Sequence, residues 1–254
     1  MKNFKDSYNE ILKSIKTSND NFDNLRVEFF IESLKDWSEK DNLESIRRWF
    51  IDQQKDCKMN IEDIPLSDCR GWSFNKNGSF SHDSGEFFYL QGLRVTNSEA
   101  REVETGWDQP IVTQVGFNGG ILGILRKKFN NIPYYLLEAK AEPGNPDIVQ
   151  ISPTLQATFS NLKQAHGGKK PKMAEFFEFP DKNKSSIIFD QWMSEDGGRL
   201  HLKRNKGMLI EVNEDYDLGK LDQSFKWFTL YQIKSLIKEN SWVGPHVRSI
   251  ISHL

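Results

Sequence analysis

The sequence predicts an α+β protein with a mixed or antiparallel sheet, a helical N-terminal region and C-terminal helices. Three observations predict this class. Apolar residues recur at helical spacing before residue 54, strand-like stretches bounded by turn signals fill residues 58–212, and helical spacing returns after residue 229. Helices, then many strands, then helices is an order typical of α+β domains.

The N-terminal region carries apolar residues in three segments of helical spacing, near residues 4–15, 25–37 and 46–50. We therefore expect residues 1–54 to form a helical extension and residues 55–254 to form the main domain. The aromatic side chains of the extension are expected in a core or a dimer contact, not against a ligand.

Residues 119–142 are expected to form an antiparallel hairpin. Two apolar runs, GGILGILRKKF and PYYLLEAKAEP, flank the short polar turn that begins at Asn130–Asn131. Further strands are expected at residues 186–192 and 207–212. The hairpin and these strands predict a sheet in the middle of the chain.

Two helices are expected at the C-terminus. Thr229 is a natural N-cap, and Gln232 lies at the capping-box position of a helix that carries apolar residues on one face. A last short helix is expected at residues 247–254.

Composition excludes several classes of function. The chain has 34 basic and 36 acidic residues, a net charge of −2, so no basic stripe predicts a nucleic-acid partner. Cys57 and Cys69 show no CxxC spacing and read as free thiols in a reducing compartment. The N-terminus lacks a signal-peptide core, and no apolar run has membrane-spanning length. We expect a cytoplasmic protein with no membrane partner.

The stretch from Tyr134 to Gly168 is the most informative part of the sequence. Much of it alternates as a strand does, and its polar side is rich in amides and hydroxyls rather than in Lys and Glu. Short hydrogen-bonding groups of this kind suit a polyhydroxylated, phosphorylated ligand. The sequence thus predicts a polar ligand pocket on a sheet.

Arginines in glycine-punctuated contexts are candidates for phosphate contacts, because guanidinium binds phosphate with two parallel hydrogen bonds. They are Arg94 in GLRV, Arg101 in SEARE and Arg199 in EDGGRL. For any one of them, a surface ion pair is the alternative.

Lys140 and His166 are candidates for charge and proton chemistry. Lys140 lies inside a strand, where it either pairs with a neighbouring glutamate or stabilises negative charge on a ligand. His166 is a candidate proton carrier, because its unperturbed pKa lies near neutrality; a structural role is the alternative.

Read as strings, these motifs resemble the NDP-hexose 2,3-dehydratase family. The resemblance rests on HDSGEFFYLQGLRVTNSEAREVETGWDQPIVTQ, GGILGILRKK, YYLLEAKAEPGNPDIVQISPTLQATFSNLKQAHGG, MSEDGGRL and WFTLYQIKSLIKEN, and it runs from about Ile64 to the C-terminus. It implies a Nudix-like fold and a cytoplasmic enzyme of deoxysugar biosynthesis. Familiar members carry two tandem copies of this unit, so two chains are expected to pair as a homodimer.

The resemblance implies 2,3-dehydration of a nucleotide-linked 4-keto-6-deoxyhexose, most often dTDP-4-keto-6-deoxyglucose, to a 3,4-diketo-2,6-dideoxy sugar, without a cofactor. A downstream 3-ketoreductase would consume the unstable product. The clustered carboxylates of the Nudix pyrophosphatase signature are absent from the sequence, so we expect no metal site and no diphosphate hydrolysis. A C3 epimerase on the same keto-sugar and a non-catalytic nucleotide-sugar binding module are the alternatives.

Roles follow as hypotheses. Glu142 or His166 is the base or acid, Lys140 the electrostatic partner of the enolate, and Arg94, Arg101 and Arg199 the phosphate contacts. The remaining candidates for substrate binding are Trp107, Gln109, Tyr135, Asn145, Gln150, Ser152, Thr154, Gln156 and Asn161.

Overall fold

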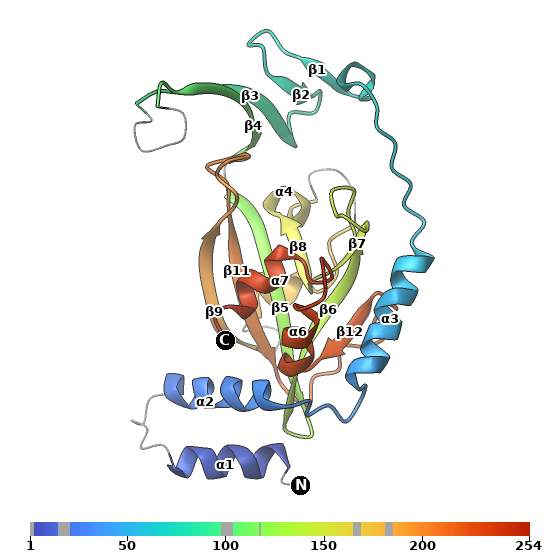
Figure 1. Cartoon of the computed structure of the whole chain (residues 1–254), viewed down its shortest axis with the longest axis vertical. Helices are drawn as coiled ribbons and strands as arrows, with labels where there is room; N and C mark the ends of the chain where they lie inside the picture. Colours follow the sequence, from blue (N-terminus) through green and yellow to red (C-terminus); the bar gives the residue numbers. More distant parts are fainter. Residues whose placement is uncertain (1–2, 15–20, 98–103, 117, 165–168, 181–184) are drawn as a thin grey trace.

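The computed structural model describes residues 3–14, 21–97, 104–116, 118–164, 169–180 and 185–254. Its helices are α1 (Phe4–Ser14), α2 (Asn21–Leu34), α3 (Leu43–Asp56), α4 (Phe159–Leu162), α5 (Ala174–Glu178), α6 (Leu230–Leu236) and α7 (Pro245–Ile251), with a 3₁₀ turn at Leu66–Asp68. Within these ranges, no helix is long and apolar enough to cross a bilayer. Helices precede and follow the strands, so the predicted α+β class is confirmed (Figure 1).

In the part of the chain that the structure describes, the strands form two sheets. The larger has the order β12-β6-β5-β11-β9, with β7 paired to β6 and β8 paired to β5. Its strands are β5 (Asn118–Phe129), β6 (Ile132–Ala141), β7 (Val149–Pro153), β8 (Leu155–Thr158), β9 (Ser185–Ser194), β11 (Arg204–Val212) and β12 (Phe225–Phe228). β5 and β11 run parallel and the other pairs antiparallel, which makes the sheet mixed, as predicted.

β5 and β6 form the predicted antiparallel hairpin. Phe129 pairs with Ile132 across a two-residue turn. The turn residues Asn130 and Asn131 have φ of 51° and 64°, the left-handed conformation that a type I′ turn requires at both central positions. Asparagine tolerates this conformation better than most residues, which is why the sequence signal was reliable here.

Helices cover both faces of the larger sheet. On one face, Phe50 of α3 and Val247 of α7 belong to the same apolar cluster as Ile151 of β7. On the other, Phe177 of α5 packs in a cluster with Leu136 of β6. The C-terminal helix α6 begins with the predicted capping box of Thr229 and Gln232.

The N-terminal helices pack at the closed end of the β5–β6 hairpin (Figure 1), where Ile31 of α2 meets Tyr134 of β6. Beside this contact lies a buried charge network around Arg126 of β5, whose side chain is 0% exposed. Its Nη2 donates to Glu32 of α2 over 2.7 Å, and its Nη1 pairs with Glu211 of β11. The network therefore joins α2 to the centre of the sheet.

The smaller sheet, which we call the arm, lies at the opposite end of the molecule from α1 and α2 (Figure 1). Its order is β1-β2-β3-β4-β10, and β10 runs parallel to β4. Its strands are β1 (Trp72–Phe74), β2 (Phe80–His82), β3 (Phe88–Val95), β4 (Trp107–Gln114) and β10 (Leu200–His201).

Candidate functional site

The larger sheet forks where β6 changes its partner. Up to Leu136 β6 pairs with β5, and from Leu137 onward it pairs with β7. Thr154, between β7 and β8, bridges the fork: its Oγ1 accepts a hydrogen bond from the N–H of Leu125 over 2.9 Å and donates to the carbonyl oxygen of Leu136. β7 and β8 thereby fill the opening between the two diverging strands.

Beyond the fork, β6 changes from apolar to charged. Glu138, Lys140 and Glu142 follow at every second position, and alternation along a strand directs such side chains to one face. Lys140 Nζ donates to the carbonyl oxygen of Gln156 over 3.4 Å, and Gln156 Nε2 donates to Glu142 Oε1 over 2.9 Å. The cation and the carboxylate are thus held on either side of one β8 residue.

β7 adds two polar residues in register with these charges. Gln150 pairs with Lys140 and Ser152 with Glu138 in the antiparallel ladder. Ser152 is buried, and Gln150 Nε2 donates to the carbonyl oxygen of Ser241 over 2.7 Å. We call the resulting group the polar cluster: Glu138, Lys140, Glu142, Gln150, Ser152 and Gln156.

The polar cluster contains groups that can bind a hydroxylated ligand and move a proton. Burial raises the pKa of Glu138; the nearby charge of Lys140 opposes this effect and that of Glu142 adds to it. Gln156 Oε1 is buried and has no hydrogen-bond partner among the described residues. A buried acceptor without a partner is costly, so it is a position where a ligand hydroxyl would gain a hydrogen bond.

His246 borders the polar cluster, although no sequence motif singled it out. A parallel bridge between Ile151 and Val243, with the N–H of Gly244 donating to the carbonyl oxygen of Ile151 over 2.9 Å, holds the start of α7 beside β7. His246 Nδ1 lies 3.9 Å from Glu195 Oε1. No local motif could reveal this, because the pairing joins segments about ninety residues apart.

The charges around His246 come from several elements. Burial lowers the pKa of its imidazole; Glu195 and Glu142 oppose the shift, whereas Lys203 and Lys140 reinforce it. The influence of Glu142 and Lys140 shows that the histidine and the polar cluster share one electrostatic environment.

Four predicted site residues serve the fold of the larger sheet and of the segments that follow its strands. Tyr135 has no exposed surface and its hydroxyl donates to Glu32 over 2.7 Å, so the structure places it in the core. Thr154 bridges the fork. Asn145 Nδ2 donates to the carbonyl oxygen of Ile148 over 3.0 Å and closes the turn after β6. Asn161 is exposed on α4, where its N–H caps onto Thr158 Oγ1.

Arg94 and Arg199 lie on the arm and in the turn before β10. Arg94 makes two hydrogen bonds of 2.9 Å to Asp108, and Arg199 Nη1 donates to Asp196 over 2.7 Å. Both guanidinium groups are largely exposed, the arrangement of the surface ion pair given above as the alternative. Arg101 and His166 lie outside the described residues.

Trp107 and Gln109 also belong to the arm. Trp107 Nε1 donates to Gln109 Oε1 over 2.6 Å, and Gln109 Nε2 donates to the carbonyl oxygen of Gly198 over 2.9 Å. Apart from the four residues that serve the fold, the described candidates therefore lie in two places, the polar cluster and the arm with the turn before β10.

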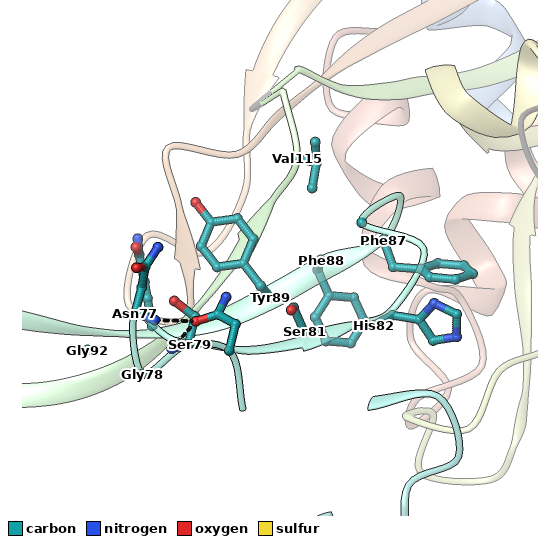
Figure 2. Close-up of a pocket in the computed structure, with 13 residues that line it drawn as sticks. Asn77, Gly78, Ser79, Ser81, His82, Phe87, Phe88, Tyr89, Gly92 and Val115 are labelled. Carbon is teal, nitrogen blue, oxygen red and sulfur yellow. Dashed lines mark hydrogen bonds between the residues drawn. The ribbon is translucent and has the colours of Figure 1, made fainter. Parts of the chain in front are cut away.

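The arm contains a hollow of about 570 Å³ that shares no residue with the polar cluster. Figure 2 shows its aromatic lining, with the rings of Phe87 and His82 side by side and Phe88 and Tyr89 on β3. Amide and hydroxyl groups of the β1–β2 turn complete it, where Asn75 Oδ1 accepts from the N–H groups of Asn77 and Ser79.

Comparison with known proteins gives the family. The model of the family described as NDP-hexose 2,3-dehydratase matches residues 43–254. The chain belongs to the NDP-hexose 2,3-dehydratase family. The predicted resemblance is confirmed, and the match includes the arm, the fork, the polar cluster and α7. It leaves out α1 and α2.

Two curated relatives carry the name dTDP-4-dehydro-6-deoxy-alpha-D-glucopyranose 2,3-dehydratase. The protein from Amycolatopsis orientalis is 37% identical over 215 residues, which cover 83% of this chain and 44% of the relative. The protein from Saccharopolyspora spinosa is 34% identical over 206 residues, which cover 80% of this chain and 40% of the relative. This family member thus spans about half the length of these relatives.

Solved structures similar to this dehydratase-family chain include Nudix proteins. The M. smegmatis Nudix hydrolase RenU has a TM-score of 0.34 at 11% identity, with 72% of this chain and 92% of that chain covered. The C. elegans Ap4A hydrolase has a TM-score of 0.31 at 14% identity, with 53% and 94% covered. Both TM-scores are below 0.5, so the Nudix-like fold stays a prediction.

Proposed function

We propose that this chain catalyses the 2,3-dehydration of a nucleotide-linked 4-keto-6-deoxyhexose, with dTDP-4-keto-6-deoxyglucose as the first substrate to test. The observation that carries the proposal is the polar cluster, in which Lys140, Glu142 and the unpartnered Gln156 Oε1 lie together in the family-matched region. The reaction is the one for which the two relatives are named.

The reaction needs a base, a stabiliser for the enolate and an acid. The C4 ketone acidifies the C3 proton, because the carbanion left behind delocalises onto the ketone oxygen. Lys140 supplies positive charge for that oxygen. Glu138, whose pKa burial raises, and Glu142 are the carboxyl groups that protonate the departing C2 oxygen. Gln150, Ser152 and Gln156 hydrogen-bond to the sugar hydroxyls, and no step requires a cofactor.

The test is incubation of the purified chain with dTDP- and UDP-4-keto-6-deoxyglucose, with a chemical reductant present to trap the diketone, followed by mass spectrometry. We expect a reduced product with one oxygen fewer than the reduced keto-sugar, which corresponds to the loss of one water. A reduced product that keeps every oxygen and has inverted C3 by NMR would identify an epimerase. A raised melting temperature with dTDP but no consumption of either keto-sugar would identify a binding module.

We further propose that two copies of the chain pair through the arm. Phe74, Phe87 and Phe88 are 70%, 40% and 45% exposed, an apolar surface of the kind that marks a protein contact. Sedimentation of the wild type should show a dimer, and Phe74→Ser together with Phe88→Ser should shift it towards monomer. A monomeric wild type would refute the pairing.

The diketone product is unstable, so we propose that a 3-ketoreductase consumes it. Both reactions belong in the cytoplasm, since a charged nucleotide sugar does not cross a membrane unaided. Replacing the chemical reductant by a purified 3-ketoreductase with its hydride donor should give a single reduced sugar. Failure of every such reductase to accept the product would contradict this order of steps.

A further inference from the structure

We propose that His246 is the general base that removes the C3 proton, and that Glu195 is the residue that positions it. The proposal rests on the dehydration proposed above and names a group that neither the family match nor the sequence motifs assign. Three features of the structure support it: the placement of α7, the contact with Glu195 and the charges that face the imidazole.

The start of α7 packs closely against Gln150 and Ser152, the residues of β7 that belong to the polar cluster. A Cβ built on Gly244 would lie 3.3 Å from the carbonyl oxygen of Ile151, 3.6 Å from Gln150 Oε1 and 3.8 Å from Ser152 Oγ. Gln150 is in turn hydrogen-bonded to the carbonyl oxygen of Ser241 in the same segment. His246, two residues after this glycine, therefore borders the polar cluster.

Glu195 is itself fixed in place. Asn205 Nδ2 donates to Glu195 Oε1, and the N–H of Glu195 donates to the carbonyl oxygen of Lys203 over 3.2 Å. The carboxylate faces Nδ1 of His246 at 3.9 Å. With Nδ1 towards the carboxylate, Nε2 is the nitrogen left to accept a proton, and the carboxylate stabilises the imidazolium that forms.

The groups that face the imidazole favour a base. Glu195 and Glu142 are its acidic neighbours, and Lys203 and Lys140 its basic ones. The side chain of His246 is 25% exposed, and its burial lowers the pKa, so the neutral form is present at neutral pH and can accept a proton.

The proposed steps move one proton from C3 and release one water. His246 Nε2 takes the proton from C3, and the electron pair of that C–H bond forms the enolate, with negative charge on the C4 oxygen near Lys140. The enolate collapses to a C2–C3 double bond as the C2–O bond breaks. The leaving oxygen takes a proton from a carboxyl group and departs as water. The resulting 3-enol then tautomerises to the 3,4-diketone.

The experiment compares His246→Asn with His253→Asn, a matched control at the end of the same C-terminal segment that contacts Phe189. We measure C3 proton exchange in D₂O, trapped product, and the rise in melting temperature with dTDP. His246→Asn should lower both exchange and product formation by about 10²- to 10⁴-fold and leave the dTDP effect intact. His253→Asn should match the wild type.

A second variant, Glu195→Gln, keeps the proposal testable if His246→Asn does not fold. Because Glu195 opposes the lowering of the pKa of His246, its loss should move the acid limb of the kcat profile to lower pH. Wild-type exchange in His246→Asn, or an unmoved acid limb in Glu195→Gln, overturns the role of the histidine. A wild type that converts no keto-sugar overturns the proposed function instead, before any variant is compared.

Discussion

We predict that the buried charge network around Arg126 stabilises the folded chain by joining α2 to the larger sheet. The guanidinium is 0% exposed, and its Nη2 lies 2.7 Å from Glu32 and 3.2 Å from Glu28. Glu32 also accepts the hydroxyl proton of Tyr135 over 2.7 Å. Glu32→Gln changes one atom of the side chain but removes one of the three carboxylates that face this arginine within the described residues.

The expected cost follows from these contacts. Removing one partner of a buried ion pair costs about 3–5 kcal/mol, because a buried charge is left uncompensated. Glu28 and Glu211 still face Arg126, and the amide oxygen of glutamine still accepts a hydrogen bond, so we expect the lower end, about 3 kcal/mol. For a chain of this size that corresponds to a melting temperature lowered by roughly 6–12 °C.

Calorimetry or circular dichroism checks the value, with Glu62→Gln as the control because Glu62 is exposed on the segment between α3 and the arm. Arg126→Met and the double variant complete a cycle. Because the two residues are in contact, the double variant should lose less stability than the sum of the single variants. A melting temperature of Glu32→Gln equal to that of Glu62→Gln, or strictly additive losses, would show that the network does not join α2 to the sheet.

Three further predictions concern the site. Lys140→Met should lower kcat about 10²- to 10³-fold, while dTDP should still raise the melting temperature of the variant. The control is Lys58→Met, because Lys58 is exposed. Equal rates in the two variants would remove Lys140 from the mechanism. Burial raises the pKa of Glu138, so its contribution to stability is present below about pH 4.5 and is lost as pH rises through the folded-state pKa. Glu138→Gln should therefore have a higher melting temperature than the wild type at pH 7.5 but not at pH 4. A difference that does not change with pH would contradict this. Thr154→Val leaves the N–H of Leu125 and the carbonyl oxygen of Leu136 unpaired and should cost about 2 kcal/mol in urea unfolding, whereas an unchanged midpoint would show that the fork holds without this side chain.

Local signals predicted the parts of the fold that depend on neighbouring residues. The Asn130–Asn131 turn and the capping box of Thr229 and Gln232 each use a few adjacent positions, and the structure shows both. Alternation along β6 predicted a polar face, and beyond Leu137 this face carries the charged Glu138 and Lys140 beside the predicted amides and hydroxyls of β7 and β8. The alternation does not show which part of the strand is buried in the core. Tyr135, which follows the same polar pattern, is therefore a false candidate: it lies buried against α2.

Residues whose environment is set by distant segments were beyond the reach of the sequence. Arg94 is predicted to contact phosphate, and no residue next to it in sequence identifies its partner in the structure, Asp108 of the neighbouring strand. Arg199 differs, because its partner Asp196 lies only three residues back, within the EDGGRL motif. His246 gains its neighbours only through the bridge between Ile151 and Val243. Its context in the sequence, a short C-terminal helix, carries no trace of the site.

The fork explains why the charged face of β6 can exist beside an apolar core. While β6 pairs with β5, its side chains are covered by helices on both faces, and residues up to Leu137 are apolar or buried aromatic. At Thr154 the ladder passes from β5 to β7, and the strands diverge. Only beyond that point do Glu138 and Lys140 appear, in register with Ser152 and Gln150. One threonine therefore joins the two functions of β6: below it the strand holds the fold together, and above it the same strand presents the groups proposed to bind the sugar.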